Sequence, residues 1–235
     1  ELAANPGKAE RARQAARLRA ARVAETLARL PELEAIKRRQ GKAADQARAS
    51  TTDAQVRPLK MADGGFRPGW NVQVVSIAAK QIVVAVDPCS SGSDRGLMRS
   101  MLERLRRRFG RLPAHHLADG GFTVGGDIEW AHGEGVAVHC PPIKSKNGGD
   151  PFQPRAEDGA GVRAWRGRMA SQDGKAQYRD RAICECIHAR WRNWNLLRLN
   201  VRGQTKVAAV MLWHALANNV LHAERMLKTH RIVTA

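Results

Sequence analysis

The sequence predicts an α/β fold in which a mixed β-sheet is flanked by helices. Residues 70–75 alternate apolar and polar side chains, and residues 81–86 are a nearly continuous β-branched run; both patterns are typical of strands. Apolar residues at helical spacing follow within residues 94–109. Two more short apolar segments, at residues 115–118 and 136–140, are separated by a helical stretch. Strands that alternate with helices in this way are characteristic of α/β folds.

The first element is a basic, Ala-rich stretch at residues 8–42, which predicts a helix. We expect Pro31 to break this helix, because proline has no N–H to donate to the preceding turn. Residues 43–58 are polar and predict a loop.

The strands at 70–75 and 81–86 are close in sequence, which predicts an antiparallel hairpin. Ser90–Asp94 contains residues typical of a helix N-cap, so we expect a helix from there to about Phe109. Its basic end suits both the helix dipole and a phosphate. The residues expected to face inward are Leu97, Met101, Leu102 and Leu105, and those at the basic end are Arg104, Arg106, Arg107, Arg108 and Arg111.

A short strand at His115–Ala118 is expected to end at Asp119. A helix at about Val124–Gly133 and a strand at Val136–Cys140 follow. Residues 141–162 are rich in Pro, Gly, Lys and Asp, which predicts an irregular insertion.

The C-terminal part predicts a helix at about 173–198, then a short strand or turn at 199–203. An apolar helix at 204–228 is expected to pack against the sheet. The residues expected to make that packing are Val207, Val210, Met211, Trp213, Leu216, Val220 and Leu221.

The charge indicates a polyanionic partner. The net charge is +18 and the isoelectric point is about 11, and neutralising phosphates releases counterions and drives binding to nucleic acid. The alternative is a solvated basic surface in an Arg-rich protein. Residues 8–42 are accordingly either a DNA-contacting arm or a solvated insertion or linker. The mean hydropathy of −0.46 and the lack of a long apolar run predict a soluble protein without a membrane span. The four cysteines form no CxxC pair and no zinc spacing, which predicts reduced cysteines in a cytoplasmic protein.

The most informative pattern is Tyr178-x2-Arg181-x3-Glu185-x6-Arg192, in which residues 178–192 contain neither Pro nor Gly. A helix would place these four residues along one side. A carboxylate among bases suits a site that holds a metal ion and binds phosphates around it.

A second carboxylate, Asp119, is expected at the end of a strand and is followed by two glycines. The pentapeptide Ala-Asp-Gly-Gly-Phe that contains it occurs also at residues 62–66. Asp63 in that first copy precedes the clear strands, so we expect it to form a turn without a catalytic role.

The order of the elements is that of a ribonuclease-H-like core that lacks its first strand. Carboxylates in such a core converge on two divalent ions, which bind the attacking and leaving oxygens of a phosphodiester displacement. Mg²⁺ (or Mn²⁺) suits these all-oxygen ligands. The expected segments are a basic helical extension or insertion at 1–48, the first part of the core at 49–144, an irregular insertion at 145–172 and C-terminal helices completing the core at 173–235.

Four parts of the chain together resemble the DDE transposases of bacterial insertion sequences: residues 50–73, Ser91–Asp94, Leu117–Phe122 and the Tyr178–Arg192 segment. Those transposases share the signature Tyr-x2-Arg-x3-Glu-x6-Lys. The sequence departs from it at the last position, where Arg192 keeps the charge but has a planar fork in place of an ammonium.

The resemblance implies that Asp119 and Glu185 are catalytic metal ligands, and that Tyr178, Arg181 and Arg192 bind transposon-end DNA. It implies hydrolysis at the transposon ends and strand transfer into target DNA. The partners implied are double-stranded DNA, as transposon ends and target, and further copies of the chain in a synaptic complex associated with the bacterial nucleoid.

In similar proteins the first catalytic Asp lies on a strand that precedes the helical stretch. We expect it upstream of residue 1, which would make the chain the C-terminal catalytic portion of a transposase. Asp53 is the substitute within the chain. The alternatives are an inactive transposase remnant or basic DNA-binding protein, or a related ribonuclease-H-like nuclease.

Two other groups allow more than one interpretation. Trp191 and Trp194 are spaced for core packing, but they could also stack on a flipped base. His115 and His116 are expected to be a strand-end pair, with a metal site as the alternative.

Overall fold

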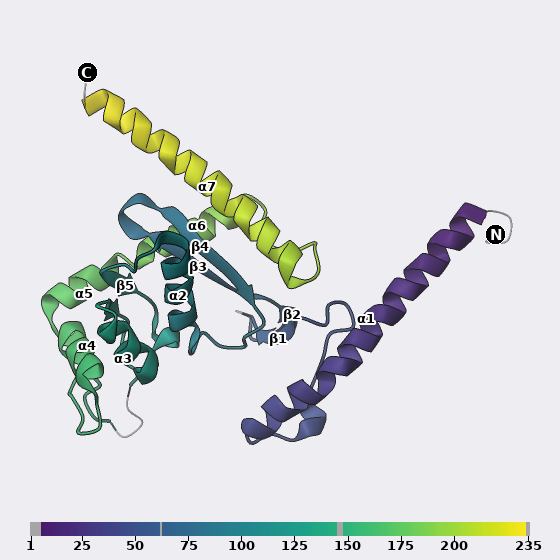
Figure 1. The fold of residues 1–235 in the computed structure, drawn as a ribbon, viewed down its shortest axis with the longest axis horizontal. Helices are drawn as coiled ribbons and strands as arrows, with labels where there is room; N and C mark the ends of the chain where they lie inside the picture. The colour runs from purple at the N-terminus through teal and green to yellow at the C-terminus, as the bar shows by residue number, and fades with distance from the viewer. Residues whose placement is uncertain (1–5, 62, 145–147, 234–235) are drawn as a thin grey trace. The chain divides into compact units, whose positions relative to one another are not determined.

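The computed structural model describes residues 6–61, 63–144 and 148–233 (Figure 1). Ala62, which begins the first copy of the repeated pentapeptide, lies outside this range, as do residues 1–5 of the expected N-terminal extension. The chain forms two compact units. The first contains the described residues up to Asn71, together with Pro88–Gly92 and Leu199–Val207, and the second contains the rest.

The first unit contains a long helix, a single 3₁₀ turn and a small antiparallel sheet. Its elements are α1 (Pro6–Arg39), η1 (Ala44–Gln46), β1 (Arg57–Lys60) and β2 (Phe66–Gly69). Residues 47–56 are irregular, in agreement with the polar loop predicted there.

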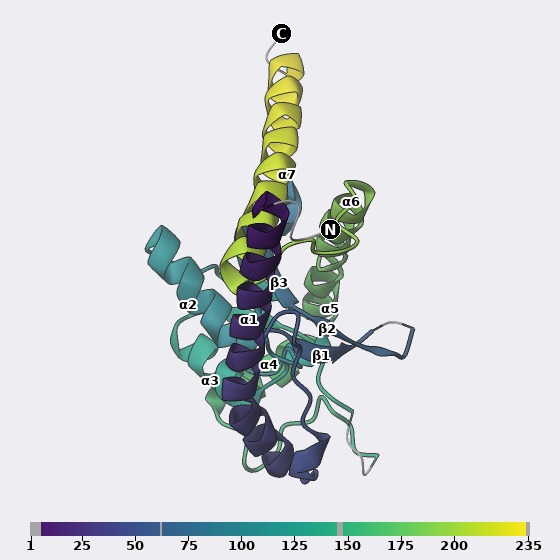
Figure 2. The same ribbon diagram turned by 90° about the vertical axis from the view of Figure 1, so that its right-hand side faces the viewer.

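Pro31 does not break α1, which continues through it in both views (Figures 1 and 2), so that expectation is wrong. A proline inside a helix removes one hydrogen bond and its ring crowds the carbonyl four residues before it, at a cost of about 3 kcal/mol. Contacts on both sides of it hold the helix: Arg29 donates a 2.9 Å hydrogen bond to the carbonyl of Ala54, and Leu33 is buried. Tertiary contacts thus outweigh the local penalty.

The second unit contains the predicted hairpin, in which β3 (Asn71–Ile77) pairs with β4 (Ile82–Cys89). The connection through residues 78–81 is too short for a parallel crossover, so the pair is antiparallel. Helix α7 (Gln204–Val233) lies against β4. The Asn219 side chain accepts from the N–H of Val83 and donates to its carbonyl, each at 2.8 Å, and so pairs with the strand as a neighbouring strand would.

The predicted apolar helix is therefore present, and its buried face agrees only in part with the expected one. Val207, Met211 and Ala215 are buried, followed one turn later by the fully buried Asn218. The expected packing residues Trp213, Leu216 and Val220 are exposed by 70%, 52% and 60% of their surface. α7 is apolar around much of its circumference, so periodicity alone could not select the face that packs.

The rest of the unit alternates strands and helices. Its elements are α2 (Leu97–Phe109), β5 (His115–Leu117), η3 (Gly120–Phe122), α3 (Gly125–Gly133), β6 (Ala137–His139), α4 (Ala160–Ala170), α5 (Gln172–Arg179) and α6 (Ala182–Asn193). β5 and β6 pair in parallel, and α3 connects them. The core contains Met98, Met101, Leu102, Leu105, Ile128, Ala131, Val138 and Trp165, which come from α2, α3, β6 and α4.

The α/β class is confirmed, but a single mixed sheet is not observed. Within the described residues the strands pair only two by two, as β1–β2, β3–β4 and β5–β6. Apolar runs predict which segments are extended and buried, but they do not specify the hydrogen-bonding partner. The ribonuclease-H-like arrangement and the four-segment division stay predictions.

The cap expected at Ser90–Asp94 is wrong, because α2 begins three residues later. Gly96 is its N-cap in the left-handed region, at φ 79°, and no side chain caps the helix. The Asp94 side chain instead accepts a hydrogen bond from Gln73 on β3. The Asp94 carboxylate, which the local sequence predicts as a helix cap, thus bonds to a residue that is distant in sequence.

Two helices differ from the C-terminal prediction. α4 forms within residues expected to be irregular, and the helix expected at 173–198 is divided into α5 and α6. At the division, the amides of Asp180 and Arg181 bond to carbonyls three residues back, at 3.2 and 3.0 Å. Such 3₁₀ bonds tighten the helix locally and rotate the residues after it relative to those before it.

Candidate active site

The structure brings three of the four signature residues together where α5 meets α6. Arg181 Nη2 lies 2.8 Å from Glu185 Oε1, and the Arg181 guanidinium lies 5.8 Å from the centre of the Tyr178 ring. Tyr178 comes from the last turn of α5, whereas Glu185 lies in the first turn of α6. The tightened turn at Arg181 thus places a guanidinium between an aromatic ring and a carboxylate.

The charge of Asp119 also affects the Arg181 guanidinium. Burial by itself lowers the pKa of Arg181, but Tyr178, Glu185 and Asp119 outweigh it, so the pKa lies above its ordinary value. Asp119 is 62 residues upstream of Arg181 by sequence numbering. The fold has therefore brought the strand-end carboxylate into the electrostatic environment of the signature residues.

Arg192 lies further along α6, with its side chain exposed. The charge of Arg192 affects His188, which lies one helical turn before Arg192. Partial burial and the charge of Arg192 lower the pKa of His188, whereas the charge of Glu185 opposes that shift. Glu185, His188 and Arg192 therefore follow one another along the same side of α6, as the spacing predicts.

Asp119 directly follows β5 and caps the 3₁₀ turn η3, its Oδ1 accepting a 2.9 Å hydrogen bond from the N–H of Gly121. A side chain at Gly121 would have no room. A Cβ atom there would lie 3.0 Å from Asp119 Oδ1 and 3.3 Å from Asp94 Oδ2. Two carboxylates therefore approach the same point beside a glycine.

Asp94 and Gln73 are the site residues that sequence reasoning missed. The buried Gln73 amide on β3 donates a 2.9 Å hydrogen bond to Asp94 Oδ1. Both residues lie in segments that resemble DDE transposases, Gln73 at the end of one and Asp94 at the end of another. Their place in these segments was the signal that the sequence offered. Only the fold shows that Gln73 and Asp94 contact each other.

The carboxylates do not form a complete metal cage. No group of three or more His, Cys, Asp or Glu side chains that could hold a metal ion occurs among the described residues. The Glu185 carboxylate forms an ion pair with Arg181, and the Glu185 side chain is 67% exposed. Arg181 thus contacts Glu185 directly and is affected by the charge of Asp119.

Asp53 and Asp63 each support a turn. Asp53, in the first unit, accepts hydrogen bonds from the backbone N–H groups of Gln55 at 3.1 Å and Gly203 at 2.8 Å. Asp63 accepts from the N–H of Gly65 at 3.0 Å and pairs with Arg67. The backbone bonds of Asp53 give it a structural role in tying residues near 203 to the loop.

Each of the tryptophan and histidine pairs contains a buried residue and a more exposed one. Trp191 is buried against the rings of His188 and His214, whereas Trp194 is 37% exposed. Trp191 therefore belongs to the core. His115 Nδ1 lies 3.1 Å from Nε2 of the buried His139, which pairs the two histidines across β5 and β6.

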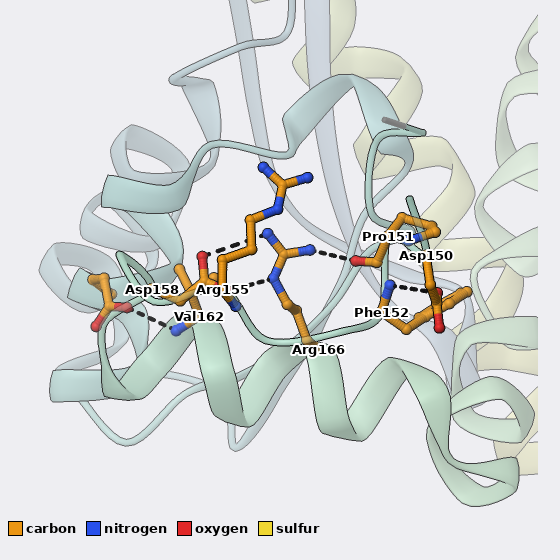
Figure 3. Close-up of polar contacts among 8 residues, drawn as sticks. Asp150, Pro151, Phe152, Arg155, Asp158, Val162 and Arg166 are labelled. Carbon is orange, nitrogen blue, oxygen red and sulfur yellow. Dashed lines mark hydrogen bonds and ion pairs between the residues drawn. The ribbon is translucent and has the colours of Figure 1, made fainter. Parts of the chain in front are cut away.

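In the segment expected to be an irregular insertion, residues 150–166 are arranged around a buried ion pair (Figure 3). Arg166 of α4 lies 2.7 Å from Asp158, with 9% and 8% of the two side chains exposed, and it also donates to the Pro151 carbonyl. Burial opposes the charge of Asp158, but Arg166 and the Arg155 N–H outweigh it and lower its pKa. The charge of Arg155 lowers the pKa of Asp158 further.

A pocket of about 640 Å³ lies beside this ion pair, between α3, α4 and the preceding loop. Glu129 of α3 lines it and caps α4, accepting from the N–H groups of Gly161 at 3.0 Å and Val162 at 2.7 Å. A carboxylate at a helix N-terminus is stabilised by the helix dipole. Glu129 is therefore a structural carboxylate.

Comparison with known protein families matches residues 36–220 to the transposase DDE domain. The match covers most of the chain and includes Asp94, Asp119 and the whole signature segment. Comparison with curated proteins found no match. Comparison with solved structures found none either. No described helix is long and apolar enough to cross a membrane.

Proposed function

Since the chain belongs to the transposase DDE-domain family, we propose that it catalyses metal-dependent phosphodiester hydrolysis and strand transfer at the ends of a bacterial insertion sequence. The observation that carries the proposal is the grouping of Tyr178, Arg181 and Glu185 within the electrostatic influence of Asp119. These residue types, at the spacing of the transposase signature, supply metal ligands next to phosphate-binding groups. We also propose a ribonuclease-H-like core.

The residues fit the divalent ion that the family implies. Asp119 and Glu185 offer only oxygen ligands, which Mg²⁺ and Mn²⁺ prefer, and Mg²⁺ keeps several of its waters, so few protein ligands suffice. Gly121 leaves open the space beside Asp119 that a Cβ atom would fill. When bound, divalent ions would activate the attacking oxygen and stabilise charge on the leaving oxygen.

The other signature residues would position the DNA. The Arg181 guanidinium can bind a phosphate in the bidentate geometry that it uses for carboxylates, so DNA would compete with Glu185 for it. The Tyr178 hydroxyl can donate to a phosphate oxygen. Arg192, which is exposed one turn beyond His188, would contact the backbone further along the same strand. These contacts hold the scissile phosphate where the carboxylates lie.

The basic surface suits double-stranded DNA, both as transposon ends and as target. Exposed basic residues of α1 include Arg11, Arg13, Arg17 and Arg19. A row of such residues attracts phosphates irrespective of base sequence. We propose α1 as a DNA-contacting arm and the nucleoid of the cytoplasm as the site of action.

We also propose that the protein acts as a homo-oligomer in a synaptic complex. Apolar residues exposed on α7, Leu212, Trp213, Leu216 and Val220, support this. They are larger and more clustered than scattered surface residues, and a second copy of the chain would remove them from water.

A DNA-binding protein without cleavage activity is the second candidate. The pairing of Glu185 with Arg181 favours it, as does the lack of a three-ligand metal group among the described residues. A transposase remnant would keep the basic surface and the salt-sensitive binding but would not cut DNA.

The test is cleavage of a supercoiled plasmid that carries the element's ends, in Mg²⁺ or Mn²⁺. We expect cutting that is lost in Asp119→Asn and in Glu185→Gln and kept in Asp63→Asn, which changes the same residue type in the other copy of the pentapeptide. Since Glu185 is exposed, Glu185→Gln should change the free energy of unfolding by less than about 1 kcal/mol. The same assay is run on a second, longer chain that begins upstream of residue 1, where the first catalytic Asp is expected. DNA binding without cutting by either chain would support the second candidate.

A further inference from the structure

The two copies of Ala-Asp-Gly-Gly-Phe form the same local turn in different surroundings. In each copy the Asp Oδ1 accepts a hydrogen bond from the second glycine, at 3.0 Å for Asp63 and 2.9 Å for Asp119. A Cβ atom on Gly65 would meet only the Asp63 carboxylate within 4 Å. The first copy is therefore a turn whose carboxylate pairs with the surface residue Arg67.

The second copy has another carboxylate beside it. A Cβ atom on Gly121 would lie 3.0 Å from Asp119 Oδ1, 3.3 Å from Asp94 Oδ2 and 3.5 Å from Asp94 Cβ. Asp94 lies 25 positions before Asp119 by sequence numbering and reaches this point from the loop that precedes α2. The same pentapeptide thus becomes a two-carboxylate site only where the fold adds Asp94.

Asp94 is held in this position from the hairpin. The Gln73 side chain on β3 is 7% exposed and donates a 2.9 Å hydrogen bond to Asp94 Oδ1, whereas Oδ2 is the oxygen that faces Gly121. Residues after Asp94 also fix its backbone, since the N–H of Leu97 donates to the Asp94 carbonyl. The amide and the turn together orient one carboxylate oxygen towards Asp119.

Two carboxylates that face one point repel each other, and a cation between them removes that repulsion. We propose that Asp94 is a further ligand of the divalent ion at Asp119, with Gln73 as its positioning residue and Gly121 as the residue that leaves room. This inference rests on the proposed function, which places a divalent ion at Asp119. It adds a carboxylate that the transposase signature does not contain.

Mn²⁺ binding to the full chain tests the inference without relying on catalysis. Free Mn²⁺ is measured by electron paramagnetic resonance, since the free ion gives a strong signal that binding diminishes. We expect Asp94→Asn to raise the Mn²⁺ dissociation constant by at least about tenfold, as is typical when a group of a metal site is lost. Gly121→Ala keeps both charges but fills the space, and it should also weaken Mn²⁺ binding.

The first copy of the pentapeptide supplies the matched controls. Asp63→Asn removes the same charge and Gly65→Ala adds the same methyl group, and neither should change Mn²⁺ affinity. The far-ultraviolet circular dichroism and the melting temperature of each variant without metal show whether it has folded. Gln73→Leu, which leaves every charge in place, should weaken Mn²⁺ binding to a smaller extent.

Three outcomes separate the inference from the function on which it rests. Weaker Mn²⁺ binding in folded Asp94→Asn and Gly121→Ala, with both controls unchanged, supports it. Loss of Mn²⁺ binding in Asp119→Asn with wild-type affinity in Asp94→Asn overturns the inference alone. Absence of Mn²⁺ binding by the wild-type chain overturns both the inference and the metal-dependent function.

Discussion

At the scale of single residues, the arginine between α5 and α6 has the most consequences. Arg181 contacts Glu185 directly, faces the Tyr178 ring and responds to the charge of Asp119. A single guanidinium is therefore paired with one expected metal ligand and affected by the charge of the other. The signature predicted that Tyr178, Arg181 and Glu185 share one side of a helix, and they do meet, but through a tightened turn between two helices.

Histidines near β5 and β6 make stability depend on pH. Burial lowers the pKa of His116 to about 4, and burial, Arg168 and His115 lower the pKa of His139. A lowered pKa means that the unfolded chain binds protons more readily than the folded protein. Stability from these groups is present above the unfolded pKa of 6.5 for His116 and decreases as the pH falls towards about 4.

Urea unfolding at pH 7.5 and pH 5 measures this effect. We expect a lower free energy of unfolding at pH 5, and a smaller difference between the two pH values in His116→Gln, since glutamine does not titrate. An equal pH dependence in wild type and variant would contradict the assignment to His116. His188→Gln should also make the difference smaller, because burial and Arg192 lower the pKa of His188 as well.

At the scale of elements, most helices and strands were predicted, but β1, β2 and α4 were missed, and several ends and faces differ from the prediction. Pro31 lies within a continuous helix, and Asp94 contributes to a tertiary contact instead of a cap. The exposed Trp213 lies on a helix whose buried face was only partly predicted, since Val207 and Met211 are buried as expected. Each difference arises where a contact distant in sequence outweighs a local preference.

The α4 helix and the preceding loop depend on one buried ion pair. Asp158→Asn would leave the Arg166 guanidinium buried without its counter-charge, at a cost of about 3–5 kcal/mol. We expect a correspondingly lower free energy of unfolding by urea at pH 7. The double variant Asp158→Asn, Arg166→Met should recover part of that loss, because no charge then stays buried. A loss below about 1 kcal/mol in the single variant would show that Arg166 finds another partner or reaches solvent.

At the scale of the whole molecule, the net charge of +18 predicts binding to DNA with a strong dependence on salt. Changing the exposed arm residues Arg11, Arg13, Arg17 and Arg19 to Ala tests whether α1 contributes. If each residue contacts a phosphate, the slope of log affinity against log salt becomes smaller by about 0.9 per residue. Fluorescence anisotropy with duplex DNA between 50 and 300 mM NaCl measures the slope, and an unchanged slope would identify α1 as a solvated extension.

The sequence by itself determined the α/β class, the basic character and most of the strands and helices, and its motifs resembled those of the transposase family to which the chain belongs. The class, the basic character and the elements follow from composition and periodicity, which act locally or as sums over the chain. Only the tertiary structure decided which residues meet: Asp94 with Gln73 and Gly121, Arg166 with Asp158, and Asn219 with Val83. The reason is physical, because a buried polar group must find a partner wherever the packed chain supplies one, and that choice depends on packing across distant segments.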